Sequence, residues 1–289
     1  MPMYDVSTKA QGLPGYAESA VIRLAALGDS TTAGFGDPMP DGSWRGWAAL
    51  LAESLGPHVA FTNFARSGAL TADVAYQQLN AAVMFRPTVA VILVGINDTL
   101  RKSFDASVVA VNLDRVVREL TKIGASVLTA CLPDPALMFG LPPSLGRPLG
   151  RRIAAVNVAV HMVADRYASV HLHTPELPGV YDPQMWSVDR LHPGERGHRL
   201  LAVGAFDVLA ARGVPVLRRP ALEPTNPTPT RSQQAMWLAT HGPRWLLARS
   251  TDLLPQLAWL VVTEWWGDLR VRLARDAGLS QAGVDRAVR

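Results

Sequence analysis

Short apolar runs alternate with longer amphipathic segments through the first 212 residues of the chain. Five of these runs are predicted to be strands, at 21–28, 59–65, 89–95, 125–132 and 169–174. The third run, VAVILVG, is apolar throughout, which is typical of a strand buried on both faces of a parallel sheet. This alternation constrains the fold more strongly than any other feature of the sequence.

Helices are predicted between these strands and after the last of them, near 46–55, 71–82, 105–123, 148–166 and 194–212. In the third helix, one face carries the apolar residues Val109, Leu113, Val116, Val117 and Leu120. The alternation predicts an α/β fold, a doubly wound (flavodoxin-like) five-stranded parallel sheet with helices on both faces. Such sheets bind ligands beyond the carboxyl ends of their strands, so functional residues are expected in those loops.

The composition predicts four segments: an N-terminal arm (1–20), a main domain (21–212), a proline-rich linker (213–230) and a tryptophan-rich helical C-terminal extension (231–289). Prolines in the linker exclude regular structure and favour an extended chain. The extension has a strongly apolar helical face. We interpret it as helices packed on the main domain or on a second subunit, with a peripheral membrane-surface helix as the alternative.

Composition also excludes several classes of protein. With 289 residues, 48% of them hydrophobic, the chain can bury one sizeable core. Its net charge of +4 is modest and the main domain has no basic run, so no nucleic-acid partner is expected. Cys131 is the single cysteine, so no intrachain disulfide can form. No secretory signal or membrane-spanning run is recognised, and a cytoplasmic, bacterial protein is expected.

Three polar or glycine-containing loops follow predicted strands. Ser30, in GDSTTAGFG, follows the first strand, where free backbone N–H groups favour negative charge, although a serine there also suits a helix cap. Gly68, in NFARSGALTAD, fits either a simple turn or the close approach of a ligand to the backbone. Asn97, in VAVILVGINDTLR, can donate a hydrogen bond into the crevice or close an Asx turn.

The fourth loop, in WSVDRLHPGERGHRLLA, combines an acid with a histidine. Asp189 lies three residues before His192, close enough to hold the Nδ1 side of the imidazole and leave Nε2 to accept a serine proton. The alternative is a surface loop with a capping aspartate. His198 is a competing base, but it lies within the predicted helix, as does Glu195 at the matching offset.

These four loops together resemble the SGNH (GDSL-type) hydrolase superfamily. GDST, ARSG, GIND and DRLH match its first, second, third and fifth sequence blocks in order, and the resemblance covers about residues 21–212. One departure is Thr31, where leucine is common, and we expect it to affect packing more than chemistry. The absence of a G-x-S-x-G motif argues against an ordinary α/β-hydrolase.

The resemblance implies a role for each matching residue. Ser30 is expected to be the nucleophile, His192 the general base and Asp189 the acid that orients it. The backbone N–H groups of Ser30 and Gly68, with the side chain of Asn97, are expected to form an oxyanion hole. The implied activity is serine-dependent hydrolysis of a carboxylic ester, with a small or a lipid-type acyl group.

Two other functions stay open at this point: acyl transfer to a sugar or metabolite hydroxyl, and a binding or scaffold protein that kept only the fold. A nucleophilic role for Cys131 is the weaker interpretation, because no histidine is near it in sequence, and a buried structural thiol is expected instead. No cofactor and no metal are expected, because no His, Cys and Asp cluster has metal-ligand spacing and no glycine-rich phosphate loop is present.

The substrate pocket is expected to take apolar surface from DPALMFGLPPSLGRPLG, at 134–150, whose prolines and glycines predict an irregular segment. Met138, Phe139 and Leu141 are the candidates there, together with Trp186 from a later loop. The expected partner is a small-molecule or lipid ester. Contact with a membrane surface or a second subunit is assigned to 231–289.

Overall fold

The computed structural model describes residues 22–187, 189 and 192–226, and from the extension residues 262, 263, 265–267, 269, 270 and 273. The predictions for 1–20 and for most of 231–289 fall outside the described residues. Among the residues that are described, no helix is both long and apolar enough to cross a membrane.

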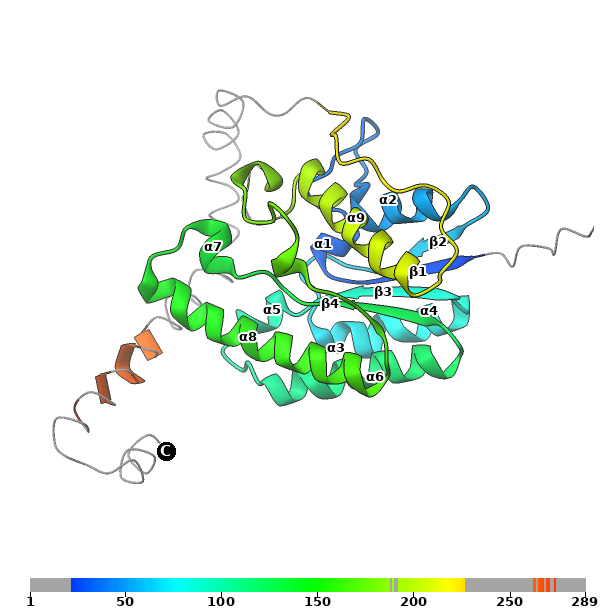
Figure 1. The fold of residues 1–289 in the computed structure, drawn as a ribbon. Coiled ribbons are helices and arrows are strands. Elements are labelled where there is room, and N and C mark those ends of the chain that lie inside the picture. The colour runs from blue at the N-terminus through cyan, green and yellow to red at the C-terminus, as the bar shows by residue number, and fades with distance from the viewer. Residues whose placement is uncertain are drawn as a thin grey trace, which may run out of the picture.

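The main domain is built on one parallel sheet, as Figure 1 shows. Its strands are β1 (Arg23–Gly28), β2 (Ala60–Asn63), β3 (Val89–Leu93), β4 (Ser126–Ala130) and β5 (Val170–Leu172), in the spatial order β2-β1-β3-β4-β5. Every pairing is parallel, and β3 is buried along its whole length. The predicted fold class is therefore confirmed.

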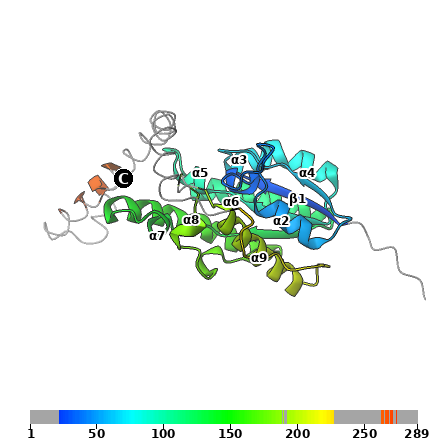
Figure 2. The same ribbon diagram turned by 90° about the horizontal axis from the view of Figure 1, so that it is seen from above.

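Helices cover both faces of this sheet. The longer ones are α2 (Gly46–Leu55), α4 (Leu79–Phe85), α6 (Ala106–Lys122), α8 (Pro143–Arg166) and α9 (Glu195–Ala211). Helices α2 and α9 pack together on one face, and α6 and α8 pack together on the other (Figures 1 and 2). The apolar face predicted for α6 is buried, which explains why this helix docks on the sheet.

A shorter helix is the next helix after each of the first four strands. They are α1 (Ser30–Ala33), α3 (Thr71–Asp73), α5 (Ile96–Thr99) and α7 (Pro135–Phe139). A five-residue π-helical turn (Val74–Gln78) joins α3 to α4. Two short 3₁₀ turns (Thr174–Glu176 and Pro183–Met185) follow β5.

The prediction of an irregular segment at 134–150 is wrong, because most of it is helical, in α7 and the start of α8. Asp134 caps α7 by accepting the N–H of Ala136, and Pro135 occupies the first helical position, where its fixed φ is favourable and its missing N–H costs nothing. Pro143 likewise occupies the first position of α8, where the cap residue is Pro142 and no side chain caps the helix. Proline was thus acting as a helix start, which its position immediately after a cap residue permits.

The first part of the proline-rich stretch has no regular structure but packs against the main domain. The N–H of Leu217 donates to the carbonyl of Ser54 in α2. Glu195, at the start of α9, accepts the N–H groups of Thr225 and Asn226. Further along, four described apolar residues of the extension have exposed side chains, Val262, Trp265, Trp266 and Leu273, whereas Leu269 is partly buried. The domain boundaries and the packing of the extension stay predictions.

Candidate active site

Ser30 stands at the sharp turn from β1 into α1. Gly28, which ends β1, has φ +150°, and a Cβ there would lie 2.2 Å from the carbonyl oxygen of Leu93, so only glycine fits. Asp29 caps α1 by accepting the N–H of Thr31 at 3.0 Å. Ser30 is the first residue of α1, and its own N–H therefore has no partner within the helix.

A chain of hydrogen bonds runs from Ser30 through His192 to Asp189. The Nε2 of His192 lies 2.9 Å from the hydroxyl oxygen of Ser30, and its Nδ1 lies 2.7 Å from a carboxylate oxygen of Asp189. A carboxylate accepts, so Nδ1 carries the proton and Nε2 is left to accept from the serine hydroxyl. The structure thus brings together three residues that the sequence separates by up to 162 positions.

The loop that carries Asp189 and His192 is held closed at its base. The N–H of Ser187 donates to the carbonyl of His192 at 2.9 Å, and Trp186 pairs with Pro193 as an antiparallel bridge. The second oxygen of Asp189 accepts the N–H of His192 at 3.1 Å and the hydroxyl of Ser187. This closure fixes the distance between acid and imidazole without a regular element.

The electrostatics of Asp189 favour its ionised form. Burial raises the pKa of this carboxyl, but the hydrogen bond and charge of His192 and the hydroxyl of Ser187 outweigh burial and lower the pKa to about 2. Asp189 is therefore a carboxylate at any pH near neutrality. Ser187 was not predicted as a site residue, although its place two residues before Asp189 was a usable signal.

Packing and an ion-pair network hold His192 from the other side. Its ring lies 5.1 Å, centroid to centroid, from Phe35, which stacks on Trp44. Nearby, Arg45 joins the buried carboxylate of Asp37 to Glu195, the first residue of α9. The loop between α1 and α2 is thereby fixed to the helix that follows His192.

Gly68, in the turn before α3, and Asn97, in α5, belong to segments that contact each other. The Nδ2 group of Asn97 donates to the carbonyl of Ala69 at 3.1 Å, and Asp98 accepts the N–H and hydroxyl of Thr71. Gly68 has φ +78°, and a Cβ added there would meet no described atom within 4 Å. Its conformation, not lack of space, is what requires glycine.

Gln78 is a positioning residue that sequence reasoning missed. Its buried side chain accepts the N–H of Gly28 at 2.9 Å and donates to the carbonyl of the same residue at 2.8 Å. Both groups of the last β1 residue before Asp29 and Ser30 are thus satisfied by one amide. Gln78 comes from the π-helical turn, and turns of this kind are frequent at functional sites.

An apolar pocket opens beside the serine and holds about 600 Å³ of empty space, part of it continuous with solvent. The pocket wall includes Asp29 and Thr31, the two sequence neighbours of Ser30, and Pro193, which follows His192. The remaining lining is mainly apolar: Leu93, Ile96, Leu132, Pro133, Met138, Thr174, Val180, Met185, Trp186, Gly197 and Leu201. Burial raises the pKa of Asp29 to about 7, so this carboxyl does not add a full charge to the pocket near neutral pH.

The four residues expected at the pocket lie in different places. Met138 and Trp186 are part of its wall. Leu141 follows α7 and is not among the lining residues, and the side chain of Phe139 lies outside the described part of the structure. Half of the wall comes from strand ends and α9, and no local pattern in the sequence singles out these particular residues.

The two competing candidates have other environments. His198 is fully buried, accepts the N–H of Trp47 at Nδ1 and contacts the carbonyl of Phe35 through Nε2. Burial lowers the pKa of His198 to about 4, so it is a neutral core histidine. Cys131 is buried, as expected, and burial raises the pKa of its thiol, which disfavours the nucleophilic thiolate.

Comparison with known proteins gives a consistent assignment. The GDSL-like Lipase/Acylhydrolase family matches residues 26–200. Among solved structures, TesA is 27% identical with a TM-score of 0.53, covering 65% of this chain and 98% of TesA. A search of curated proteins finds no match.

Two more distant structures share the fold. A lipase/acylhydrolase from Enterococcus faecalis is 20% identical, with a TM-score of 0.54, over 70% of this chain and all of that chain. Axe2, an acetyl xylan esterase from Geobacillus stearothermophilus, is 18% identical, with a TM-score of 0.53, over 65% of this chain and 94% of that chain. All three matches cover nearly the whole neighbour and leave about a third of this chain unmatched.

Proposed function

Because the chain belongs to the GDSL-like lipase/acylhydrolase family of ester-hydrolysing enzymes, we propose that it cleaves carboxylic esters through an acyl-enzyme formed on Ser30. The observation that carries the proposal is the hydrogen-bonded chain from the Ser30 hydroxyl through His192 to Asp189, beside an apolar pocket. A serine hydroxyl is a weak nucleophile until an adjacent base accepts its proton, and this arrangement supplies that base.

In the first half-reaction, the Ser30 oxygen attacks the ester carbonyl while its proton passes to Nε2 of His192. Asp189, ionised and bonded to Nδ1, stabilises the imidazolium that forms. Collapse of the tetrahedral intermediate breaks the ester C–O bond, and His192 returns the proton to the leaving alcohol. The acyl group remains on Ser30 as an ester.

The negative charge on the carbonyl oxygen needs donors during both half-reactions. In this proposal they are the N–H groups of Ser30 and Gly68 and the Nδ2 group of Asn97. The first belongs to the unpaired start of a helix, and the third keeps one N–H beyond the bond to Ala69. Water then attacks the acyl-enzyme with His192 as base, which releases the acid and restores the serine.

The pocket suggests the substrate class. Its mainly apolar lining, which includes both sequence neighbours of Ser30, suits an apolar acyl group better than a sugar, because a buried sugar hydroxyl would have few hydrogen-bond partners there. Val180 is a buried member of this wall. A larger side chain at this position would shorten the space available to the acyl chain.

A chain-length series of p-nitrophenyl esters from C2 to C16 tests this proposal. We expect activity that depends on Ser30 and an optimum that moves to shorter chains in Val180→Phe. The matched control is Val158→Phe, at an exposed position of α8, which should leave the optimum unchanged. Adding sugar or metabolite alcohols and measuring free acid against new ester separates hydrolysis from acyl transfer. Failure of a fluorophosphonate to label the protein would instead support a binding role.

A further inference from the structure

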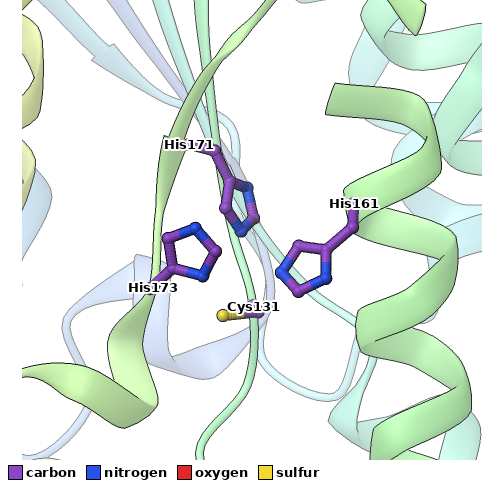
Figure 3. A group of neighbouring side chains, drawn as sticks. All are labelled: Cys131, His161, His171 and His173. Atoms are coloured by element: carbon purple, nitrogen blue, oxygen red, sulfur yellow. The ribbon is translucent and has the colours of Figure 1, made fainter. Parts of the chain in front are cut away.

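Three histidines and the single cysteine gather on one side of the sheet, on elements that the esterase proposal does not use. Cys131 directly follows β4, His171 is the central residue of β5, His173 follows β5, and His161 lies on α8. Figure 3 shows the three imidazole rings and the thiol converging on a shared space between the sheet edge and the helix.

The pleat of the two strands explains this convergence. Thr129 of β4 pairs with His171 of β5, so residues two positions further on, Cys131 and His173, project from the same face. Leu172 points to the opposite face, where it packs close to Gly204 of α9. Helix α8 packs on β4 and β5 and brings His161 over the first face.

The distances are those of a ligand set. One nitrogen from each histidine and the sulfur of Cys131 all lie within 4.8 Å of one another. Ring centroids are 4.7 Å apart for His161 and His171, 5.1 Å for His161 and His173, and 4.6 Å for His171 and His173. No other group of this kind occurs among the described residues.

Two ring nitrogens of the cluster are buried without a hydrogen-bond partner in the described structure, the Nε2 atoms of His161 and His171. Buried polar atoms are nearly always paired, so two unpaired ring nitrogens in one cluster point to a ligand that both can bind. The other nitrogen of His171 is bonded to the hydroxyl of Thr129 at 2.9 Å. That bond fixes the ring and leaves Nε2 for a ligand, as outer partners of metal-binding histidines do.

We propose that Cys131, His161, His171 and His173 form a tetrahedral binding site for a divalent transition-metal cation of the zinc type. Imidazole nitrogen and thiolate sulfur are the donors that Zn²⁺ prefers, and four protein ligands without an open position are typical of a structural site. Tetrahedral bond lengths place ligand atoms about 3.5 Å apart, so even the widest pair of ligand atoms needs to close by only about 1 Å on binding.

The electrostatics of the cluster agree with this geometry. Burial, with the charges of His173 and His161, lowers the pKa of His171 to about 4, so the imidazole is neutral and free to ligate. Burial raises the pKa of the Cys131 thiol, so metal binding expels that proton. Asp165 and Glu176 supply nearby negative charge, and the exposed His173 gives the ion a route in.

Such a cation would stiffen one wall of the pocket. Leu132 and Pro133, which follow Cys131, line the pocket, and so does Thr174, which follows His173. The ion would tie the ends of β4 and β5 to α8 directly behind these residues. No metal was expected from the sequence because these ligands have no short metal-ligand spacing; strand register and helix packing bring them together.

Co²⁺ titration of the chelator-stripped full chain tests the site. We expect one equivalent to bind with a thiolate-to-cobalt charge-transfer band in the near ultraviolet and the strong visible bands of tetrahedral Co²⁺, and Zn²⁺ should displace it. Cys131→Ser should abolish the charge-transfer band. His173→Gln, at an exposed position, should weaken binding strongly, and Thr129→Val should weaken it by about 10–100-fold.

The matched control is His58→Gln, an exposed histidine on the loop before β2, which should bind Co²⁺ as the wild type does. Circular dichroism of each metal-free variant checks that it folds, and if Cys131→Ser does not fold, His173→Gln and Thr129→Val decide. Absence of the charge-transfer band in the wild type overturns the proposal. So does its persistence in folded Cys131→Ser, or wild-type affinity in both His173→Gln and Thr129→Val. None of these readouts depends on esterase activity.

Discussion

The main domain holds two kinds of histidine site, one at His192 and one at His161, His171 and His173, and the partners of their ring nitrogens differ. His192 has a carboxylate on one ring nitrogen and a serine hydroxyl on the other. His161 and His171 each have a buried nitrogen with no hydrogen-bond partner in the described structure, and their neighbours are another histidine and a thiol. The first arrangement suits proton transfer and the second suits ligation.

This difference shows that the partner, not the residue type or the location, determines what a histidine can do. An ionised Asp189 at 2.7 Å stabilises a positive imidazole, which a general base needs. At His171, burial and two neighbouring imidazoles disfavour the positive form. The neutral form that remains is the one that a metal ligand needs. Each histidine site can be tested by replacing the partner of the imidazole while the imidazole itself is kept.

Ser30→Ala has the largest expected effect. It removes the nucleophile but leaves the imidazole and its acid, so kcat for p-nitrophenyl esters should fall by about 10⁶-fold. Steady-state kinetics measure the loss. The matched control is Ser107→Ala, an exposed serine at the start of α6, which should keep full activity. Full turnover by Ser30→Ala would remove the basis for treating His192 as a catalytic base.

Asp189→Asn tests the role of the acid. The amide keeps the shape but not the charge and favours the wrong tautomer, so kcat should fall by about 10⁴-fold. The control is Asp165→Asn, which removes a negative charge that acts on His171 and should not change esterase kinetics. Equal losses in the two variants would show that the two groups are not distinct in the way described.

Asn97→Ala should cost about 10²- to 10³-fold in kcat with little change in KM, because the amide is assigned to the developing oxyanion. Asn80→Ala, at an exposed position in α4, is the control. A change confined to KM would instead assign Asn97 to substrate binding, and unchanged kinetics would remove it from the site.

His198 provides the smallest effect and a third type of histidine, whose ring contacts the backbone only. The pKa of His198 is lowered to about 4 by burial, so the unfolded chain binds more protons than the folded one between about pH 4 and 6.5. The neutral, buried His198 therefore contributes to the free energy of unfolding above pH 6.5, and this contribution is lost as the pH falls towards 4. It should cost about 2 kcal/mol of unfolding free energy at pH 5 relative to pH 7.

Urea unfolding of the wild type and of His198→Gln at both pH values gives the change in unfolding free energy between pH 7 and pH 5 for each protein. The difference between these two changes is the contribution of His198. The comparison of the two proteins is necessary because Asp29 acts in the opposite direction: burial raises the pKa of Asp29 to about 7, and its contribution is lost as the pH rises. Identical pH dependence in the two proteins would contradict the assignment of a neutral, buried His198.

The sequence predicted the sheet, its five strands and the longer helices, because buried parallel strands and amphipathic helices leave periodic patterns. It also predicted that Ser30, Asp189 and His192 would meet, through loops that a resemblance could align. It did not predict Gln78 bonding to Gly28, because that contact joins two elements fifty residues apart through a single amide. The Cys131 cluster was not predicted either, because its members come from three elements that only the folded chain brings together.

The central claim is that the Ser30 hydroxyl, activated by His192, carries the acyl group. Intact-mass analysis after treatment with a fluorophosphonate tests it most directly, with peptide mapping to locate the adduct. The account predicts a single adduct on Ser30 in the wild type, much slower labelling in Asp189→Asn and none in Ser30→Ala. An unlabelled wild-type protein, or an equal adduct in Ser30→Ala, would contradict it.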